Sequence, residues 1–265
     1  GLSVLQGRVT ELPALAAGRV RLGGSSHAPF TVSGPLYRAV AAWAVAERLP
    51  VAIHLAESRD ETALITGGDG AFAASWRARG IVLPGDPAHG AGDGARRSPA
   101  AWVDSFAVLG PETLCIHAVQ VDAADIALLA ARGVAVAHCT RANRRHGHGD
   151  APMRDLRDAG LRVGLGTDSA ASVAPTDLWA EARMAAGLGG LAPSEVLALL
   201  TADGAAALGL QGEAGVLAPG AWGDVLVMAG GGDTGEGAVR SVLAAGAAGV
   251  RATLLAGRVV SGRLP

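Results

Sequence analysis

The chain has 265 residues, of which 50% are hydrophobic and 17% are charged, and its formal net charge at pH 7 is -2. This length suits one large α/β domain, or a domain with a small appendage. The near balance of charges excludes a strongly basic surface of the kind that binds nucleic acid or another polyanion.

Residues 20–133 alternate short apolar runs with segments of helical periodicity, which is typical of βα units around a parallel sheet. In chain order we predict a strand at 20–22, a helix at 34–47, a strand at 51–53, helical residues at 59–79 interrupted by glycines, a strand at 114–116 and a helix at 122–133. Asp122 and Gly133 are suited to begin and end the last of these helices. Residues 80–99 are rich in Gly and Pro, and a loop of this length is usually functional or disordered.

Residues 134–210 continue the same alternation. The expected order is a strand at 134–137, a helix at 150–160 begun by Asp150, a strand at 163–165, and helices at 177–186 and 193–208. Beyond Gly212 the pattern changes to strand runs at 216–217, 224–228 and 252–260, separated by Pro219-Gly220 and a glycine-rich loop at 230–237. The sequence therefore predicts five βα units within residues 1–210, followed by a small β portion over 211–265.

The two cysteines, Cys115 and Cys139, each lie in an apolar run. They predict no disulfide framework and favour a reducing cytoplasm. No run reaches the roughly 18 apolar residues of a membrane span, and no basic segment followed by an apolar one predicts export. Because the first residue is Gly1 and not methionine, we expect a processed protein or a fragment of a longer one.

Polar residues follow several of the predicted strands. His54, His117 and Asp168 each come directly after a short apolar run or within a few residues of it. In a parallel α/β barrel the carboxyl ends of the strands form one face, where active sites lie. Imidazoles and a carboxylate are usual ligands of a catalytic Zn²⁺, which lowers the pKa of its bound water to about 7. Glu57, three residues beyond His54, is placed to move protons in the same pocket.

Four segments resemble the successive motifs of deaminases and chlorohydrolases of the amidohydrolase superfamily. They are Ser26-His27-Ala28-Pro29-Phe30-Thr31-Val32-Ser33, His54-Leu55-Ala56-Glu57-Ser58, Cys115-Ile116-His117-Ala118 and Gly166-Thr167-Asp168-Ser169-Ala170-Ala171-Ser172. Residues 215–224 and 251–260 are similar to strands of the family's C-terminal β-sandwich. The resemblance covers nearly the whole chain and is nearest to the aminofutalosine, adenosylhomocysteine and guanine deaminase-like enzymes.

The resemblance implies a TIM-barrel-like α/β fold that lacks the first strands and ends in a small β-sandwich portion. It implies one divalent metal ion, either Zn²⁺ or Fe²⁺, held by His54, His117 and Asp168. Asp168 would also accept a proton from the attacking water, Glu57 would protonate a ring nitrogen of the substrate, and His117 would hold the hydroxide or polarise the leaving centre. The residues implied in substrate binding are His27, Arg141, Asn143 and Ser169.

The implied enzyme hydrolyses C–N bonds other than peptide bonds, with a metal-bound hydroxide that deaminates a purine- or nucleoside-like small molecule. Hydrolysis of another C–N or C–Cl bond on a related heterocycle is the alternative within the same class. No lysine follows a predicted strand where a carbamate bridge could form, which favours one metal ion over two. We expect neither a nucleic-acid nor a membrane partner, and leave open a homo-oligomer or a missing N-terminal segment.

The sequence departs from the family pattern in two places. The family's first strand carries a His-x-His pair that supplies two metal ligands, and no such pair precedes His27; His146-Gly147-His148 lies in a polar segment and is interpreted as a surface loop. Residues 139–143 resemble the family's Cys-Pro-x-Ser-Asn run, with Thr140 and Ala142 replacing Pro and Ser, and His138 is interpreted as a hydrogen-bonded residue at a strand end. A catalytically inactive chain that needs a partner segment is therefore the alternative from a different class.

Overall fold

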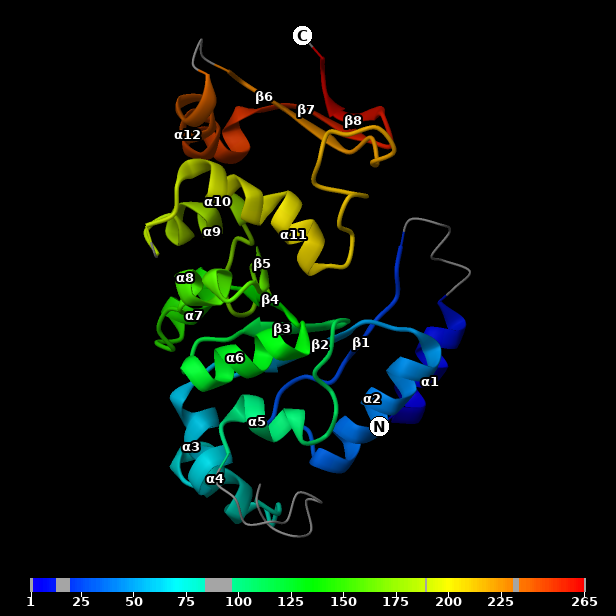
Figure 1. The fold of residues 1–265 in the computed structure, drawn as a ribbon, viewed down its shortest axis with the longest axis vertical. Coiled ribbons are helices and arrows are strands. Elements are labelled where there is room, and N and C mark those ends of the chain that lie inside the picture. Colours follow the sequence, from blue (N-terminus) through cyan, green and yellow to red (C-terminus); the bar gives the residue numbers. More distant parts are fainter. Residues whose placement is uncertain (1, 13–19, 84–96, 189, 231–233, 265) are drawn as a thin grey trace. The chain divides into compact units, whose positions relative to one another are not determined.

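The computed structural model describes residues 2–12, 20–83, 97–188, 190–230 and 234–264, and Figure 1 shows its fold. The chain packs into two compact units, Gly1–Ala135 and Val136–Pro265. One five-stranded sheet has the order β1-β2-β3-β4-β5, which is also the order of the chain, and a three-stranded sheet has the order β6-β7-β8. Four of the five predicted βα strands, the total of five strands and the small β portion are thereby confirmed, and the five strands do not close into a barrel.

The first unit alternates parallel strands with helices. Strand β1 (Gly24–Ser25) pairs in parallel with β2 (Val51–Leu55), which pairs in parallel with β3 (Thr113–His117). The helices are α1 (Leu2–Glu11), α2 (Gly34–Glu47), α3 (Arg59–Gly67), α4 (Gly70–Ala78), α5 (Pro99–Asp104) and α6 (Ala123–Arg132). In the register of β2 and β3, Leu55 lies opposite His117. The carboxyl ends of these strands therefore meet at one edge of the sheet.

Helix ends in the first unit follow the signals in the sequence. Helix α2 has the predicted bounds, and the predicted interruption of the helical segment 59–79 falls at Gly68, which has a φ of 67°. The Asp122 side chain accepts a hydrogen bond from the Asp125 amide at 2.9 Å and so begins α6, and Gly133 ends it with a φ of 68°. Side chains that accept helix N–H groups and glycines with positive φ are the usual helix boundaries.

The strand predicted at 20–22 was wrong, because the first strand lies at Gly24–Ser25. In the parallel register Gly24 lies opposite Val51, so an earlier start would pair with Pro50. Proline has no N–H to donate to a sheet, and the Pro50 carbonyl is already bonded to the Gly24 amide at 2.9 Å. Val20 is 59% exposed, although it is apolar.

The second unit continues the alternation and then changes character. Its elements are β4 (Ala135–His138), α7 (Thr140–Arg145), α8 (Met153–Asp158), β5 (Arg162–Leu165), α9 (Leu178–Ala185), α10 (Pro193–Leu200), α11 (Ala202–Ala207), β6 (Val225–Met228), α12 (Gly235–Ala245), a 3-10 turn at Gly246–Gly249, β7 (Val250–Leu255) and β8 (Arg258–Gly262). Strands β6, β7 and β8 are antiparallel neighbours. The expected domain boundary between residues 210 and 211 stays a prediction.

Three expectations about the second unit were wrong. Asp150 does not begin a helix: α8 begins at Met153, and the Asp150 carboxylate instead accepts two hydrogen bonds from Arg144, at 2.7 and 2.9 Å. The helix expected over 193–208 is divided at Thr201, whose φ and ψ of −127° and −100° are not helical. The strand run at 216–217 does not form, and Leu217 is 84% exposed.

The strand run expected over 252–260 is a hairpin. Strands β7 and β8 are joined at Ala256 and Gly257, which have φ values of 51° and 74°. Two consecutive residues with positive φ form the tight turn that matches the twist of a two-residue hairpin. Apolar content alone does not distinguish one long strand from two short ones.

Cys115 and Cys139 are buried free thiols, and burial raises the pKa of the Cys115 thiol to about 12. Within the described ranges, no helix is both long and apolar enough to cross a membrane.

Candidate active site

Residues with unusual backbone conformations gather at the strand ends. Five non-glycine residues at strand ends have positive φ values: His27 (30°), Ala56 (51°), His117 (79°), Ala118 (49°) and Asp168 (58°). Each such conformation costs on the order of 1–3 kcal/mol and persists where the surrounding structure imposes it, most often at functional sites. Three of the five are residues that the sequence singled out. We therefore expect the functional residues in the turns that follow the strands.

Three imidazoles lie in a row in the first unit. The ring centroids of His27 and His54 are 5.0 Å apart, and those of His54 and His117 are 5.3 Å apart. Main-chain bonds fix this row, because the His54 amide donates to the His27 carbonyl at 2.7 Å and the Ala118 amide donates to the Leu55 carbonyl at 3.0 Å. The parallel sheet thus brings together histidines that are far apart in sequence.

The spacing of His54 and His117 suits a shared metal ion. Two imidazoles bound to one tetrahedral Zn²⁺ at about 2.1 Å have ring centroids about 5 Å apart, close to the 5.3 Å between these rings. His117 is buried and His54 is half-buried. Neutral imidazoles in such a position are suitable ligands for a divalent ion.

Glu57 lies beside this histidine pair. Its Oε1 is 3.6 Å from His117 Nε2, and its side chain is 17% exposed. The two groups form an ion pair when His117 is protonated. His27, His54, Glu57 and His117 are therefore neighbours within the first unit, as the strand-end argument predicted for the residues of β2 and β3.

A buried carboxylate, which was not predicted from the sequence, holds the turn that contains Glu57. Glu61 is fully buried, and its two oxygens accept the main-chain N–H groups of Ala56 at 2.8 Å and Glu57 at 3.0 Å. Burial raises the pKa of the Glu61 carboxyl to about 7, the two amide hydrogen bonds lower it, and the charge of Glu57 raises it again. The Ser58-x-x-Glu61 spacing of a capping box was the signal that could have found this residue.

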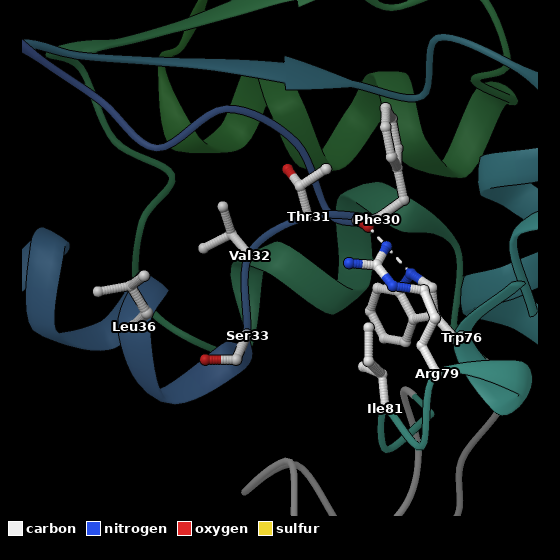
Figure 2. A pocket seen from close by; sticks show the side chains of 8 residues that line it. All are labelled: Phe30, Thr31, Val32, Ser33, Leu36, Trp76, Arg79 and Ile81. Atoms are coloured by element: carbon white, nitrogen blue, oxygen red, sulfur yellow. Dashed lines mark hydrogen bonds between the residues drawn. The ribbon is translucent and has the colours of Figure 1, made fainter. Parts of the chain in front are cut away.

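His27 is held by a hydroxyl that borders a cavity. Its Nδ1 lies 2.6 Å from Thr31 Oγ1, which also donates to the Ala28 carbonyl at 3.0 Å. Thr31 lines a cavity of about 420 Å³ together with Phe30, Val32, Ser33, Leu36, Trp76, Arg79 and Ile81 (Figure 2). The Trp76 indole nitrogen donates to the Phe30 carbonyl at 3.2 Å, drawn as a dashed line in Figure 2. The cavity wall and the His27 contact thus share one short segment.

Asp168 follows β5 in the second unit. Its side chain is half-buried and its main chain has a φ of 58°. The Gly166 amide donates to the His138 carbonyl at 3.0 Å, which fixes the start of the turn. Ser169 is exposed, and its Oγ accepts a hydrogen bond from the Ser172 amide at 3.2 Å. The Ser169 hydroxyl therefore helps to fold the loop after Asp168.

The remaining predicted site residues follow β4 and make internal contacts. Asn143 is fully buried, with its amide nitrogen 3.3 Å from His138 Nδ1, so His138 is the hydrogen-bonded strand-end residue that was predicted. The Arg141 guanidinium donates to the Pro175 carbonyl at 2.9 Å and lies 4.0 Å from Glu181. The substrate contacts of Arg141 and Asn143 stay predictions.

The His146-Gly147-His148 segment follows α7. The two rings stack with centroids 5.5 Å apart, and His146 is exposed. This is the arrangement of a surface segment, in agreement with the interpretation of this His-x-His sequence.

Comparison with known proteins identifies the family. Residues 5–260 match the model of the amidohydrolase family. A curated relative, the 5-methylthioadenosine/S-adenosylhomocysteine deaminase of Haloarcula marismortui, is 34% identical over 226 residues, which are 82% of this chain and 46% of that protein. The chain thus spans about half the length of the curated relatives it matches.

Solved structures share the fold. The aminofutalosine deaminase of Helicobacter pylori superposes with a TM-score of 0.84 at 20% identity, over 98% of this chain and 64% of that one. An adenosine deaminase from Xanthomonas campestris, solved with bound zinc, superposes with a TM-score of 0.74 at 23% identity, over 97% of this chain and 56% of that one. With the family model matching nearly the whole sequence, the chain belongs to the amidohydrolase family.

Proposed function

We propose that this chain carries a catalytic site for metal-dependent hydrolytic deamination of a purine- or nucleoside-like compound. The observation that carries the proposal is the cluster in the first unit, where Glu57 lies 3.6 Å from His117 and the His117 ring lies 5.3 Å from that of His54. A proton-transferring carboxyl beside two ligand-type imidazoles is the combination that this hydrolysis needs. The deaminase relative and the zinc-containing neighbour add support.

We propose His54, His117 and Asp168 as the residues that hold one divalent ion, with zinc as the first candidate. These three are a group of ligand-type side chains among the described residues that could hold an ion. Imidazole and carboxylate are the donors that zinc takes at catalytic sites. The bound ion would supply a water of lowered pKa, and would leave proton transfer to the protein.

The proposed proton transfers fall to two carboxylates. Asp168 accepts the proton of the attacking water and passes it to the amino group, which leaves as ammonia. Glu57 delivers a proton to a ring nitrogen of the substrate and takes one back from the added hydroxyl as the carbonyl forms. His117 polarises the reacting centre, and His27 borders the bound substrate. Arg141, Asn143 and Ser169 are proposed as further substrate contacts.

Metal analysis of the purified chain together with an ammonia-release assay tests the proposal. We expect about one ion per chain and ammonia release from 5-methylthioadenosine or a related nucleoside. Asp168→Asn should lose the ion. Glu57→Gln should keep the ion, because Glu57 is not a proposed ligand, and should lose turnover by roughly 100-fold or more.

The competing interpretation is a catalytically inactive chain that needs a partner segment. A chain that binds no ion and releases no ammonia would support this interpretation and refute the proposed activity. Ammonia release that depends on Asp168 would refute the inactive chain.

A further inference from the structure

The turn between β2 and α3 is held by a side chain to which the proposed chemistry gives no part. Glu61, in the first turn of α3, is fully buried and uses both carboxylate oxygens on consecutive main-chain amides, those of Ala56 and Glu57. Ala56 has a φ of 51°, a conformation that an alanine keeps only where its surroundings impose it. The carboxylate therefore fixes the main chain directly in front of the Glu57 side chain.

Helix α6 provides a comparison, because it also has a carboxylate at its third position but is not preceded by a turn of this kind. Asp125 is the third residue of α6, and its carboxylate accepts the amide of Asp122, the residue before the helix, at 3.4 Å. Glu61 is likewise the third residue of α3, and its own amide bonds to Ser58 Oγ at 3.2 Å. The Glu61 carboxylate, however, reaches past Ser58 to the two residues before it. Its contacts go beyond what capping of the helix requires.

A charged carboxylate is energetically unfavourable at the buried position of Glu61. Burial and the neighbouring charge of Glu57 both oppose ionisation of Glu61. A glutamine would avoid the charge, but its amide group offers one acceptor oxygen and would set its NH₂ against the second main-chain N–H. Only a carboxylate supplies two acceptors for two parallel donors.

The position of Glu57 depends on this turn. Glu57 Oε1 lies 3.6 Å from His117 Nε2, beyond the usual hydrogen-bond distance, so a small displacement of the main chain changes the contact substantially. A misplacement of about 1 Å in a catalytic group can cost about 100-fold in rate.

We propose that Glu61 is the positioning residue for Glu57: by binding the amides of Ala56 and Glu57 it sets where the Glu57 carboxylate stands relative to His117. The proposal rests on the proposed function only in its kinetic consequence. The hydrogen bonds that it invokes can be tested without any turnover.

Amide hydrogen exchange, followed by NMR on the full 265-residue chain, tests the contact itself. Glu61→Gln should make at least one of the Ala56 and Glu57 amides exchange about tenfold faster or more, because one of the two acceptors is lost. The matched control is Asp125→Asn, at the same position of α6, which should leave those two amides unchanged. Unchanged exchange of both amides in Glu61→Gln would overturn the proposal.

Kinetics test the positioning role. Glu61→Gln should lower kcat about 10- to 100-fold with KM and metal content nearly unchanged. Glu61→Asp keeps the charge but is one methylene too short to reach both amides, so it should lose kcat as well. If Glu61→Asp keeps full activity, charge and not reach is what matters, and the positioning role is wrong.

A double variant separates positioning from general stability. If Glu61 acts through Glu57, then Glu57→Gln combined with Glu61→Gln should be no slower than Glu57→Gln alone. If the two losses of kcat multiply in the double variant, the proposal is wrong. A wild-type chain without ammonia release refutes the proposed function instead, and the exchange experiment then still decides whether Glu61 holds the turn.

Discussion

Glu61 shows how burial and hydrogen bonding oppose each other within one side chain. The carboxylate accepts two main-chain amides that stabilise its charged form, yet burial outweighs them and raises its pKa from 4.5 to about 7. Glu181 in the second unit is in a similar position: it is fully buried, it accepts the Arg141 amide at 2.9 Å, and burial raises its pKa. Both residues bind main-chain amides that follow a strand, β2 for Glu61 and β4 for Glu181. In each case burial of the carboxyl group is unfavourable for its charged form, and the hydrogen bonds that it accepts fix the main chain.

The raised pKa of Glu61 predicts a pH dependence of stability. Between pH 4.5 and about 7 the folded chain keeps a proton on Glu61 that the unfolded chain has released. The Glu61 contribution to the free energy of unfolding should therefore fall as the pH rises through this window, by about 3 kcal/mol in total. Denaturant titrations of the wild type and of Glu61→Gln at pH 4.5 to 8 measure it. Parallel pH profiles for the two proteins would contradict the raised pKa.

The sequence predicted that His54, Glu57 and His117 lie close together, but not the contacts that hold them there. His54, Glu57 and His117 were found because they follow apolar strands, and parallel pairing brings such positions together. The role of Glu61 was missed, because a capping-box spacing indicates where a helix begins and not which amides the carboxylate reaches. The contact of Thr31 with His27 was missed for a similar reason, since it depends on the conformation of a turn.

At the scale of elements, a side-chain cap and a surface ion pair can be compared directly. Asp122→Ala removes the acceptor of the Asp125 amide at the start of α6 and should lower the free energy of unfolding by about 1 kcal/mol. Asp150→Ala removes only a largely exposed pair with Arg144, and should cost a few tenths of a kcal/mol that vanish in high salt. Denaturant titrations at low and high salt measure both. Equal losses in the two variants would mean that the Asp122 cap contributes no more than the surface pair.

Helix and strand positions were predictable where local chemistry sets them, and elsewhere they were not. Helix α2 and the ends of α6 follow from apolar spacing, Asp122 and Gly133. The late start of β1 depends on the partner strand, where Pro50 ends the pairing. The division at Thr201 and the hairpin turn at Ala256 were missed because the residues around them are mostly apolar or small, so that periodicity carries no boundary signal there.

At the scale of the whole molecule, the small sheet leaves apolar residues uncovered. All five residues of β8, the edge strand, are exposed, and they include Val259 at 45% and Val260 at 59%. On the other two strands of this sheet Leu226 and Leu255 are each 50% exposed. An exposed edge strand with apolar side chains is a site where chains associate.

This exposure predicts concentration-dependent self-association. Val260→Lys places a charge on the edge strand and should reduce association, as measured by sedimentation velocity over a range of protein concentrations. Val45→Lys is the matched control: it adds the same charge on α2, where Val45 is 79% exposed, and should leave association unchanged. If both variants associate as the wild type does, the edge strand is not the contact.

The cavity beside His27 gives the protein an optical reporter of its own. Trp76 is only 8% exposed and its indole is bonded to the Phe30 carbonyl, in the segment whose Thr31 holds His27. Indole emission responds to the polarity and hydrogen bonding of its immediate surroundings. A ligand that enters the cavity, or a shift of residues 27–31 when a substrate binds, should therefore change the colour of the intrinsic fluorescence. With the other four tryptophans replaced, the segment around a proposed substrate-contacting histidine can thus be followed in solution without any attached dye.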